Sequence, residues 1–350
     1  MPNKMSVTLM LSCVGGATSA ILLQQLRQNG IFEYRLIGID SQGPGRSSAQ
    51  LDAFHIVPNG SDSDYLDRLL EIVDKEKVEF ILPGSDEEAL AMARGREQLL
   101  HAGARPMISS DETLALIADK AATYKCLAEQ GIAVPEYTLV EDVDALSAAT
   151  QDYGYPQRTV VCKPASGRGG RGLHILVGQD GPADWLGAGK REKRIELQEY
   201  GEKAMGNMVQ GPTLVMPSMQ APAYDADIVA QEGNASLIVV RQRMNPAGIP
   251  FEGNRIMANS EVQEYCRTVA KALGLDAVHD VDLMTDVDGA VQVLEVNPRP
   301  SGSMAASLVA GFNVVDVAIG KLLDYPVEQA EASDELLVFP RNGSMVVERQ

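Results

Sequence analysis

The stretch VLEVNPRPSGS, residues 293–303, is an apolar strand-like run that ends in a turn with two prolines. Glu295, Asn297 and Arg299 occupy alternate positions in it. Because alternate side chains of an extended chain point to the same side, this run would present a carboxylate, an amide and a guanidinium together. A structural turn does not require that combination of groups, which therefore indicates a binding or catalytic site.

The residues before this stretch predict a hairpin. Two strand-like runs, VDLMTDV and AVQVLEV, flank Asp288-Gly289, which is a strong signal for a two-residue turn. Counting back from such a turn places Asp282 directly opposite Glu295. The alternation also predicts a polar face and an apolar face: Asp280, Asp282, Glu295 and Asn297 share the first, and Val281, Leu283, Leu294 and Val296 share the second.

The predicted polar face requires a cation. Carboxylates directly opposite one another on paired strands repel by up to about 1 kcal/mol. Oxygen ligands without His or Cys select a hard ion, and magnesium prefers one or two carboxylates together with phosphate oxygens. The pattern therefore predicts Mg²⁺, or Mn²⁺, that carries a nucleotide. The alternative is an exposed acidic hairpin, and a loop of three residues would shift the register and separate the facing pair.

A glycine-rich loop lies upstream. The strand TVVCK ends at Lys163 and continues into PASGRGGRG, residues 164–172. Glycines are interleaved with arginines there, which suits backbone amides and guanidinium groups that wrap phosphate oxygens. The loop lacks the GKS or GKT ending of a Walker motif. Considered alone, it is also compatible with a solvated, flexible turn.

Residues 1–112 alternate short apolar runs with helical patterns, which predicts βαβ units and a doubly wound parallel sheet. The first strand is expected at 7–12 and the first helix at 18–28. Asp40, at the end of the second strand, stands where a dinucleotide-binding fold places a ribose ligand. The turn at 14–19, VGGATS, lacks the GxGxxG spacing, so a plain strand–turn–helix is preferred over an NAD site.

Composition limits the class of protein. The chain has 350 residues and a formal net charge of −18, which argues against binding to nucleic acid or to an anionic membrane. No apolar run approaches the ~18 residues of a membrane span. The cysteines show no metal-binding or disulfide spacing, which fits a reducing cytoplasm: Cys13, Cys126, Cys162 and Cys266.

Four motifs occur in a fixed order: Asp119-Lys120, Lys163 with its glycine loop, LQEY at 197–200, and LEVNPRPSG at 294–302. In this order they resemble the ATP-grasp enzymes, in the branch similar to the carbamoyl-phosphate synthetase large subunit and biotin carboxylase. The resemblance covers nearly the whole chain. It implies an α/β and α+β architecture, with a Rossmann-like domain at 1–112, a small ATP-grasp lobe at 113–196 and a large lobe at 197–350.

The resemblance implies a nucleotide site between the lobes. The ATP phosphates would be bound by Lys120 and Lys163. The loop that closes over them would include Ser166, Gly167, Gly169, Gly170 and Gly172. At a hinge between the lobes, backbone groups of Glu199 and Tyr200 would read the adenine edge, and Leu294 would pack on its ring.

The resemblance also implies a metal site and a substrate site. The magnesium ligands would be Asp282, Glu295 and Asn297. Arg299 would hold bicarbonate, a carboxylate or an acyl phosphate, because a planar guanidinium binds a carboxylate through two hydrogen bonds. The residues that follow it complete the expected substrate site: Ser301, Gly302 and Ser303.

The sequence departs from the family pattern at two positions. Ala223 stands where relatives usually place a ribose-binding Glu, and Glu202 is the candidate to replace it. Peptide-forming relatives often carry an Arg two positions before the first metal carboxylate, where this chain has Asp280. The candidates for that oxyanion role are Arg243 and Arg255.

The expected activity is ATP-dependent ligation of a carboxylate to an amine through an acyl phosphate, with release of ADP and phosphate. The partners implied are small-molecule acid and amine substrates and a second copy of the chain in a homodimer. Two alternatives remain open: a bicarbonate-activating carboxylase or carbamoyl-phosphate-type enzyme, and an ATP-binding protein without turnover.

Overall fold

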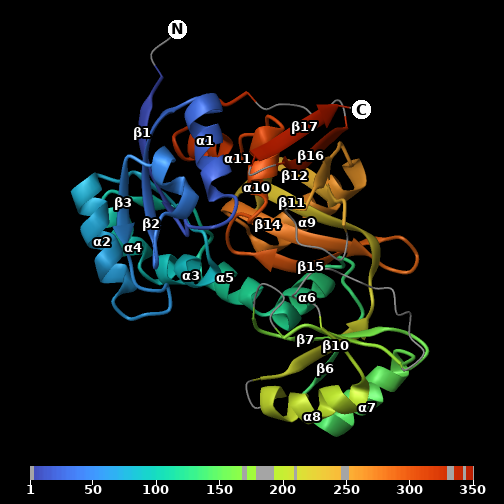
Figure 1. Ribbon diagram of the computed structural model, residues 1–350. Helices are drawn as coiled ribbons and strands as arrows, with labels where there is room; N and C mark the ends of the chain where they lie inside the picture. Colours follow the sequence, from blue (N-terminus) through green and yellow to red (C-terminus); the bar gives the residue numbers. More distant parts are fainter. Residues whose placement is uncertain are drawn as a thin grey trace.

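The computed structural model describes residues 4–167, 172–178, 193–208, 211–245, 252–328, 335–341 and 344–349. Over these residues the chain forms three sheets (Figure 1). The first is parallel and lies in the N-terminal part, the second has five strands, and the third has seven. No helix in the described ranges is both long and apolar enough to cross a membrane. The predicted α/β and α+β architecture is confirmed.

The first sheet has the strand order β3-β2-β1-β4-β5. Its strands are β1 (Ser6–Ser12), β2 (Glu33–Asp40), β3 (Ala53–Ile56), β4 (Phe80–Leu82) and β5 (Arg105–Pro106). Its helical elements are α1 (Ser19–Asn29), η1 (Gly45–Gln50), α2 (Tyr65–Glu76), α3 (Asp86–Arg94) and α4 (Arg96–His101). The strand expected at 7–12 and the helix expected at 18–28 are confirmed to within one residue.

The order of the strands places a topological switch point between β1 and β4, because the chain leaves β1 toward β2 and later returns to β4 on the other side. Ligands of open α/β sheets bind at the carboxyl ends of such strands. Asp40, at the end of β2, instead accepts hydrogen bonds from the backbone N–H groups of Gly15 (3.0 Å) and Gln42 (2.9 Å). Its carboxylate therefore organises the neighbouring turns.

Two helices lead from this sheet to the rest of the molecule, α5 (Asp111–Ala118) and α6 (Lys120–Glu129). Asp119 caps α6, since its carboxylate accepts from the N–H groups of Ala121 (2.8 Å) and Ala122 (3.0 Å). A capping Asp is favoured there because the first N–H groups of a helix have no partner within the helix. The cap fixes Lys120 as the first residue of α6.

The second sheet has the order β6-β10-β7-β8-β9. Its strands are β6 (Thr138–Val140), β7 (Val160–Pro164), β8 (His174–Leu176), β9 (Lys193–Ile195) and β10 (Thr213–Pro217), and its helices are α7 (Val143–Asp152) and α8 (Leu197–Met208). Because β10 pairs with both β6 and β7, residues up to Pro217 belong to this lobe. The expected boundary at residue 197 is therefore about 20 residues too early by the strand bounds.

The third sheet has the order β15-β14-β11-β12-β13-β16-β17. Its strands are β11 (Gln220–Gln231), β12 (Asn234–Arg243), β13 (Asn254–Ile256), β14 (Ala277–Thr285), β15 (Val291–Asn297), β16 (Leu336–Arg341) and β17 (Ser344–Arg349). Its helices are α9 (Ser260–Leu273), α10 (Met304–Val309) and α11 (Val314–Leu322). Buried side chains of α10 and α11 share one core with β1 and α1, so this lobe packs against the first sheet.

The β14–β15 hairpin differs from the prediction. The Asp286 N–H bonds the Ala290 carbonyl (2.9 Å), so the loop has three residues, 287–289, and Gly289 adopts the left-handed conformation (φ 86°). A bulge then follows, because Asp282 pairs with Glu295 whereas Leu283 pairs with Val293. The extra residue, Leu294, restores the register that the longer loop would have shifted. The facing pair of Asp282 and Glu295 is confirmed.

The bulge corrects the predicted apolar face. Val293, rather than Leu294, joins Val281, Leu283 and Val296 in the buried core. A bulged residue has no partner on the neighbouring strand, so its carbonyl is available for other donors.

Candidate functional site

Carboxylates gather on one face of β11, β14 and β15. Across β14 and β15, Asp280 pairs with Asn297 and Asp282 with Glu295, and the Asn297 side-chain amide donates to Asp280 (3.1 Å). On the other side of β14, Asp225 of β11 lies opposite Asp282. Carboxylate oxygens of Asp225, Asp280 and Asp282 lie within 4.8 Å of one another. Burial raises the pKa of Asp282 to about 7, although Arg243 opposes this effect.

Cationic side chains already contact two of the expected metal ligands. Lys120 Nζ lies 3.0 Å from Glu295 Oε1, and Arg243 Nη2 lies 3.1 Å from Asp282 Oδ1. Arg243 also pairs with Asp225 (2.6 Å). Among the described residues, the positive charge on this face therefore comes from Lys120 and Arg243, and the expected metal ion stays a prediction. The carboxylate and amide oxygens of Asp282, Glu295 and Asn297 lie at facing or neighbouring strand positions, and oxygen ligands of this kind fit Mg²⁺ or Mn²⁺.

A second ion-pair network lies beside the first and is fully buried. Arg241 Nη2 contacts Asp227 (2.8 Å) and Asp280 (3.3 Å), and its Nη1 donates to the Ser303 hydroxyl. Asp227 also accepts from the Ser307 hydroxyl (2.5 Å). Arg241 and Arg243 alternate on β12 just as Asp225 and Asp227 alternate on β11, so both pairs lie on the same face of the sheet.

Lys163 is held at the bulge. Its ammonium donates to the Tyr124 hydroxyl (3.0 Å) and to the Leu294 carbonyl (3.3 Å), and the Tyr124 hydroxyl donates to the same carbonyl (2.7 Å). Burial lowers the pKa of Lys163 to about 8, while Glu295 and Asp282 act in the opposite direction. The lysine from the second sheet therefore lies beside the carboxylates of the third.

The glycine loop begins next to Lys120. Lys120 Nζ donates to the Gly167 carbonyl (2.6 Å), and residue Ser166 forms a bridge with Asp119. Gly167 and Gly172 both have positive φ. Gly169 and Gly170 lie outside the described residues, as do Arg168 and Arg171. Lys120 thus links the start of this loop to Glu295 on β15.

The turn after β15 contacts the first sheet. Arg299 Nε donates to Asp86 Oδ1 (3.0 Å), and the hydroxyl of Thr18 donates to the Gly302 carbonyl. The hydroxyls of Ser301 and Ser303 lie 2.8 Å apart. Arg299 and the serine turn therefore meet the carboxyl edge of the first sheet beside the buried Arg241.

Three expected site residues lie elsewhere. Arg255 pairs with Glu335 (2.7 Å), and about 40% of its side chain is exposed. Glu199 and Tyr200 lie in the first turn of α8 and not at a hinge. Tyr200 is buried in the core of the second lobe because its ring packs against His174, with ring centroids 4.9 Å apart. In the described residues, the chain passes from the second sheet to the third after Pro217, and not at Glu199 and Tyr200.

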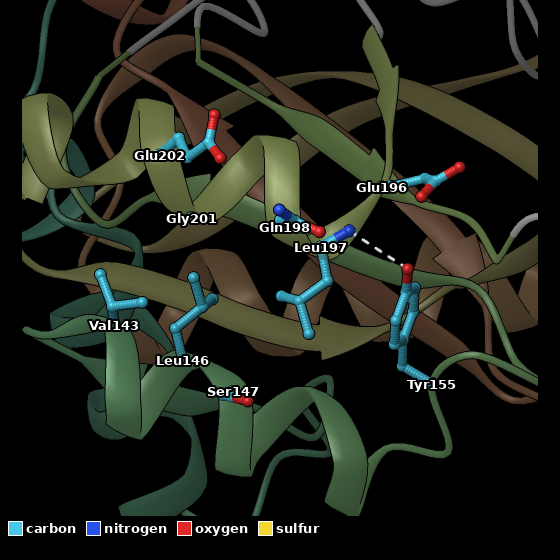
Figure 2. Close-up of a pocket in the computed structure, with 9 residues that line it drawn as sticks. All are labelled: Val143, Leu146, Ser147, Tyr155, Glu196, Leu197, Gln198, Gly201 and Glu202. Atoms are coloured by element: carbon cyan, nitrogen blue, oxygen red, sulfur yellow. Dashed lines mark hydrogen bonds between the residues drawn. The ribbon is translucent and has the colours of Figure 1, made fainter.

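Glu202 also lies in the second lobe, at a cavity of about 530 Å³ between α7 and α8 (Figure 2). The apolar side chains of Val143, Leu146 and Leu197 point toward one another there, and the Leu197 N–H donates to the Tyr155 hydroxyl (3.1 Å). None of the carboxylates on β14 and β15 lines this cavity. Glu202 is therefore not placed to replace the ribose ligand.

Sequence reasoning missed five residues of the site: Asp86, Tyr124, Asp225, Asp227 and Arg241. Of these, Asp225 and Asp227 gave a usable signal, since charged residues at alternate positions of an otherwise apolar strand require partners on its neighbours. Asp86 and Tyr124 gave none, because their contacts come from segments far away in the sequence.

Two family models match the chain. One, described as ATP-grasp in the biosynthetic pathway with Ter operon, matches residues 210–340, and the other, PylC-like, N-terminal domain, matches residues 11–107. A carbamoyl phosphate synthase large chain from Clostridium acetobutylicum is 22% identical over 74% of this chain and 23% of its own length. A carbamoyl-phosphate synthase from Methanobrevibacter smithii is 24% identical over 77% of this chain and 70% of its own length. The chain thus spans about a quarter of the first of these relatives.

Solved structures share the fold. N5-carboxyaminoimidazole synthetase from Staphylococcus aureus superposes with a TM-score of 0.68 at 15% identity, over 96% of this chain and 82% of that one. An L-amino acid ligase from Bacillus licheniformis gives 0.67 at 14% identity, over 97% and 80%. A biotin carboxylase from Campylobacter jejuni gives 0.67 at 15% identity, over 95% and 75%. A family model described as ATP-grasp thus matches residues 210–340, and over nearly its whole length the chain shares the fold of these solved structures.

Proposed function

We propose that the protein is an ATP-dependent ligase that joins a carboxylate to an amine through an acyl phosphate and releases ADP and phosphate. The observation that carries this proposal is the position of Lys120. It contacts both Glu295 on β15 and the first glycine of the loop, Gly167. One cation thereby joins the expected metal strand to the expected phosphate loop.

The residues would divide the work as follows. Lys120 and Lys163 bind and orient the ATP phosphates, and Arg299 holds the acid. Asp282, Glu295 and Asn297 would hold Mg²⁺ or Mn²⁺, which neutralises charge on the phosphates. The acid oxygen bonds to the γ-phosphorus as the bond from that phosphorus to ADP breaks, and ADP leaves with the electron pair. The amine nitrogen, protonated in the free substrate, gives up one proton before it attacks the acyl carbon. As the C–N bond forms, the C–O bond to phosphate breaks, phosphate leaves with that electron pair, and the nitrogen gives up its second proton to phosphate or solvent.

The adenine site belongs at the passage between the second and third sheets. Residues 217–220 connect β10 to β11 there, so we assign to this segment the role expected of Glu199 and Tyr200. Leu294 keeps its proposed place against the ring, since it is only partly buried and lies beside Lys163. We further propose a homodimer, and a reaction in the cytoplasm, where the chain's free cysteines stay reduced.

A bicarbonate-activating reaction is the second candidate, because relatives in sequence and in structure are named carbamoyl phosphate synthase and biotin carboxylase. A single experiment separates the candidates. The protein is incubated with ATP, Mg²⁺ and pairs of proteinogenic L-amino acids, or with bicarbonate alone. ADP release that requires two amino acids, with a product mass equal to their sum minus water, supports the ligase. ADP release with bicarbonate alone supports the alternative, and no release with any of them contradicts both.

A further inference from the structure

The switch point of the first sheet carries one charged side chain that the reaction above leaves without a role. Asp86 is the first residue of α3, directly after the loop that follows β4. Its carboxylate contacts Arg299 at 3.0 Å, across 213 residues of sequence. Both side chains are mostly buried yet reachable from solvent, with 15% of Asp86 and 18% of Arg299 exposed.

Each member of this pair uses only part of its bonding capacity. Arg299 donates through Nε to Asp86 and through Nη1 to the Pro300 carbonyl (2.8 Å), and no acceptor among the described residues contacts its Nη2. Asp86 accepts through Oδ1, and no donor among the described residues contacts its Oδ2. By contrast, both carboxylate oxygens of Asp225 and of Asp227 are engaged.

The Arg299 guanidinium can still bind an anionic group, and the Asp86 carboxylate can still bind a cationic group beside it. The guanidinium holds the carboxylate or acyl phosphate in the proposed reaction. The nearest free acceptor oxygen, on Asp86, suits a protonated amine, since an ammonium group has only donors. Two reactants held on groups 3.0 Å apart lie close enough for attack on the acyl carbon once the ammonium group has given one proton to the Asp86 carboxylate, because only the neutral amine has the lone pair that forms the C–N bond.

We propose that Asp86 binds the protonated nitrogen of the amine substrate, which assigns this substrate to amines that carry a positive charge at neutral pH, such as α-amino acids. This inference rests on the proposed ligase function. It gives the first sheet a direct part in substrate recognition, at the crevice where open α/β sheets bind their ligands.

An ordinary salt bridge that only orients Arg299 makes a different prediction. If Asp86 served Arg299 alone, its loss would weaken the use of the acid and would slow every reaction of the acyl phosphate equally. If Asp86 binds the ammonium group, its loss selectively weakens the use of charged amines. Hydroxylamine distinguishes the two, because it is uncharged at neutral pH and captures acyl phosphates as hydroxamates.

The test compares Asp86→Asn with the parent, with Asp86→Glu and with Asp74→Asn, a control whose carboxylate lies on the surface of the same domain and pairs with Lys77. Each protein receives ATP, Mg²⁺ and each proteinogenic L-amino acid as the acid, with a second amino acid or hydroxylamine as the nucleophile. We expect Asp86→Asn to lower the ratio of amide to hydroxamate by about 10- to 100-fold and to raise the KM of the amine. Asp86→Glu should recover much of the ratio, and Asp74→Asn should leave it unchanged.

A binding measurement separates failure of this inference from failure of the proposed function. Calorimetry follows the amides of the amino acids, which carry only the ammonium group, and their N-acetyl derivatives, which carry only the carboxylate. Asp86→Asn should no longer bind the amides but should still bind the N-acetyl derivatives. Arg299→Lys should still bind the amides but should no longer bind the N-acetyl derivatives. Equal losses of amide and hydroxamate in Asp86→Asn, or a parent that binds none of the amides, would overturn the inference. A parent that binds amides but forms no hydroxamate would overturn the ligase function alone.

Discussion

Replacing Glu295 by Gln should destabilise the protein even without a metal. The facing pair considered alone would predict stabilisation, because the change relieves repulsion between Asp282 and Glu295. In the structure, however, Glu295 is the ion-pair partner of Lys120 at 3.0 Å, and the two side chains are only 18% and 9% exposed. The variant replaces the carboxylate by a neutral amide, so a nearly buried ammonium loses its ion-pair partner and keeps only uncharged acceptors, the Gly167 carbonyl and the new amide oxygen.

The size of the effect follows from that geometry. A hydrogen bond to a charged group contributes about 1.5–3 kcal/mol, and breaking a buried pair costs about 3–5 kcal/mol. Because Lys120 keeps uncharged acceptors and Glu295 is partly exposed, we expect a loss of about 2 kcal/mol, near the lower end of these ranges. For a chain of this size that corresponds to a fall in the melting temperature of about 3 °C or more.

The assay is thermal and urea unfolding in excess EDTA. Glu264→Gln is the matched control, since its ion pair with Arg267 spans one helical turn and its side chain is 70% exposed, so the expected change is below about 0.5 kcal/mol. Lys120→Met and the double variant complete a mutant cycle, in which a coupling of at least about 1 kcal/mol is expected. A melting temperature equal to or above that of the parent in Glu295→Gln would refute the ion-pair reasoning and restore the repulsion argument.

Further changes test other parts of the site. ATP affinity, measured by calorimetry, should fall as the pH rises through about 8, because Lys163 then loses its proton, whereas Lys163→Met should bind about tenfold or more weakly and show no such inflection. Gly172→Ala should cost about 1–2 kcal/mol of unfolding free energy, since its φ is 79° and the new Cβ would lie 2.8 Å from Pro164 Cγ. Arg241→Met should cost about 3 kcal/mol or more, because it leaves buried carboxylates unpaired. Arg255→Ala should change activity less than twofold, because Arg255 forms a partly exposed ion pair and, opposite Gln242, faces the other side of the sheet from the carboxylates.

The register of the hairpin shows what the sequence could predict and what it could not. Asp288-Gly289 correctly indicated a turn, but a glycine with positive φ suits both a two-residue turn and a three-residue loop. The bulge at Leu294 has no local signal, because its carbonyl is held by Tyr124 and Lys163 from other elements. The facing pair was predicted correctly because two unpredicted features compensate each other.

The hinge was misplaced for a related reason. The amino-acid sequence of LQEY resembles the hinge segment of the family, but a segment acts as the hinge only if it connects the two sheets. The run forms the start of α8, whose buried Tyr200 packs in the second lobe, and another strand, β10, follows before the chain enters the third sheet. Which sheet a segment joins depends on tertiary contacts. A short motif read from sequence alone is therefore easily assigned to a strand when it lies in a helix, or the reverse.

Sequence motifs predicted which charged residues belong to the site, but only the structure shows which of them form ion pairs. Asp282 and Glu295 were expected to bind a metal ion, yet Glu295 pairs with Lys120 and Asp282 pairs with Arg243. A metal ion bound by these carboxylates would compete with both cations for the same oxygens. Lys120 would then turn toward the phosphates beside Gly167, the loop residue it already contacts. We therefore expect metal and phosphate binding to be coupled through Lys120, so that Lys120→Met weakens the dependence of ATP affinity on Mg²⁺ concentration. An unchanged dependence would show that the two sites bind independently.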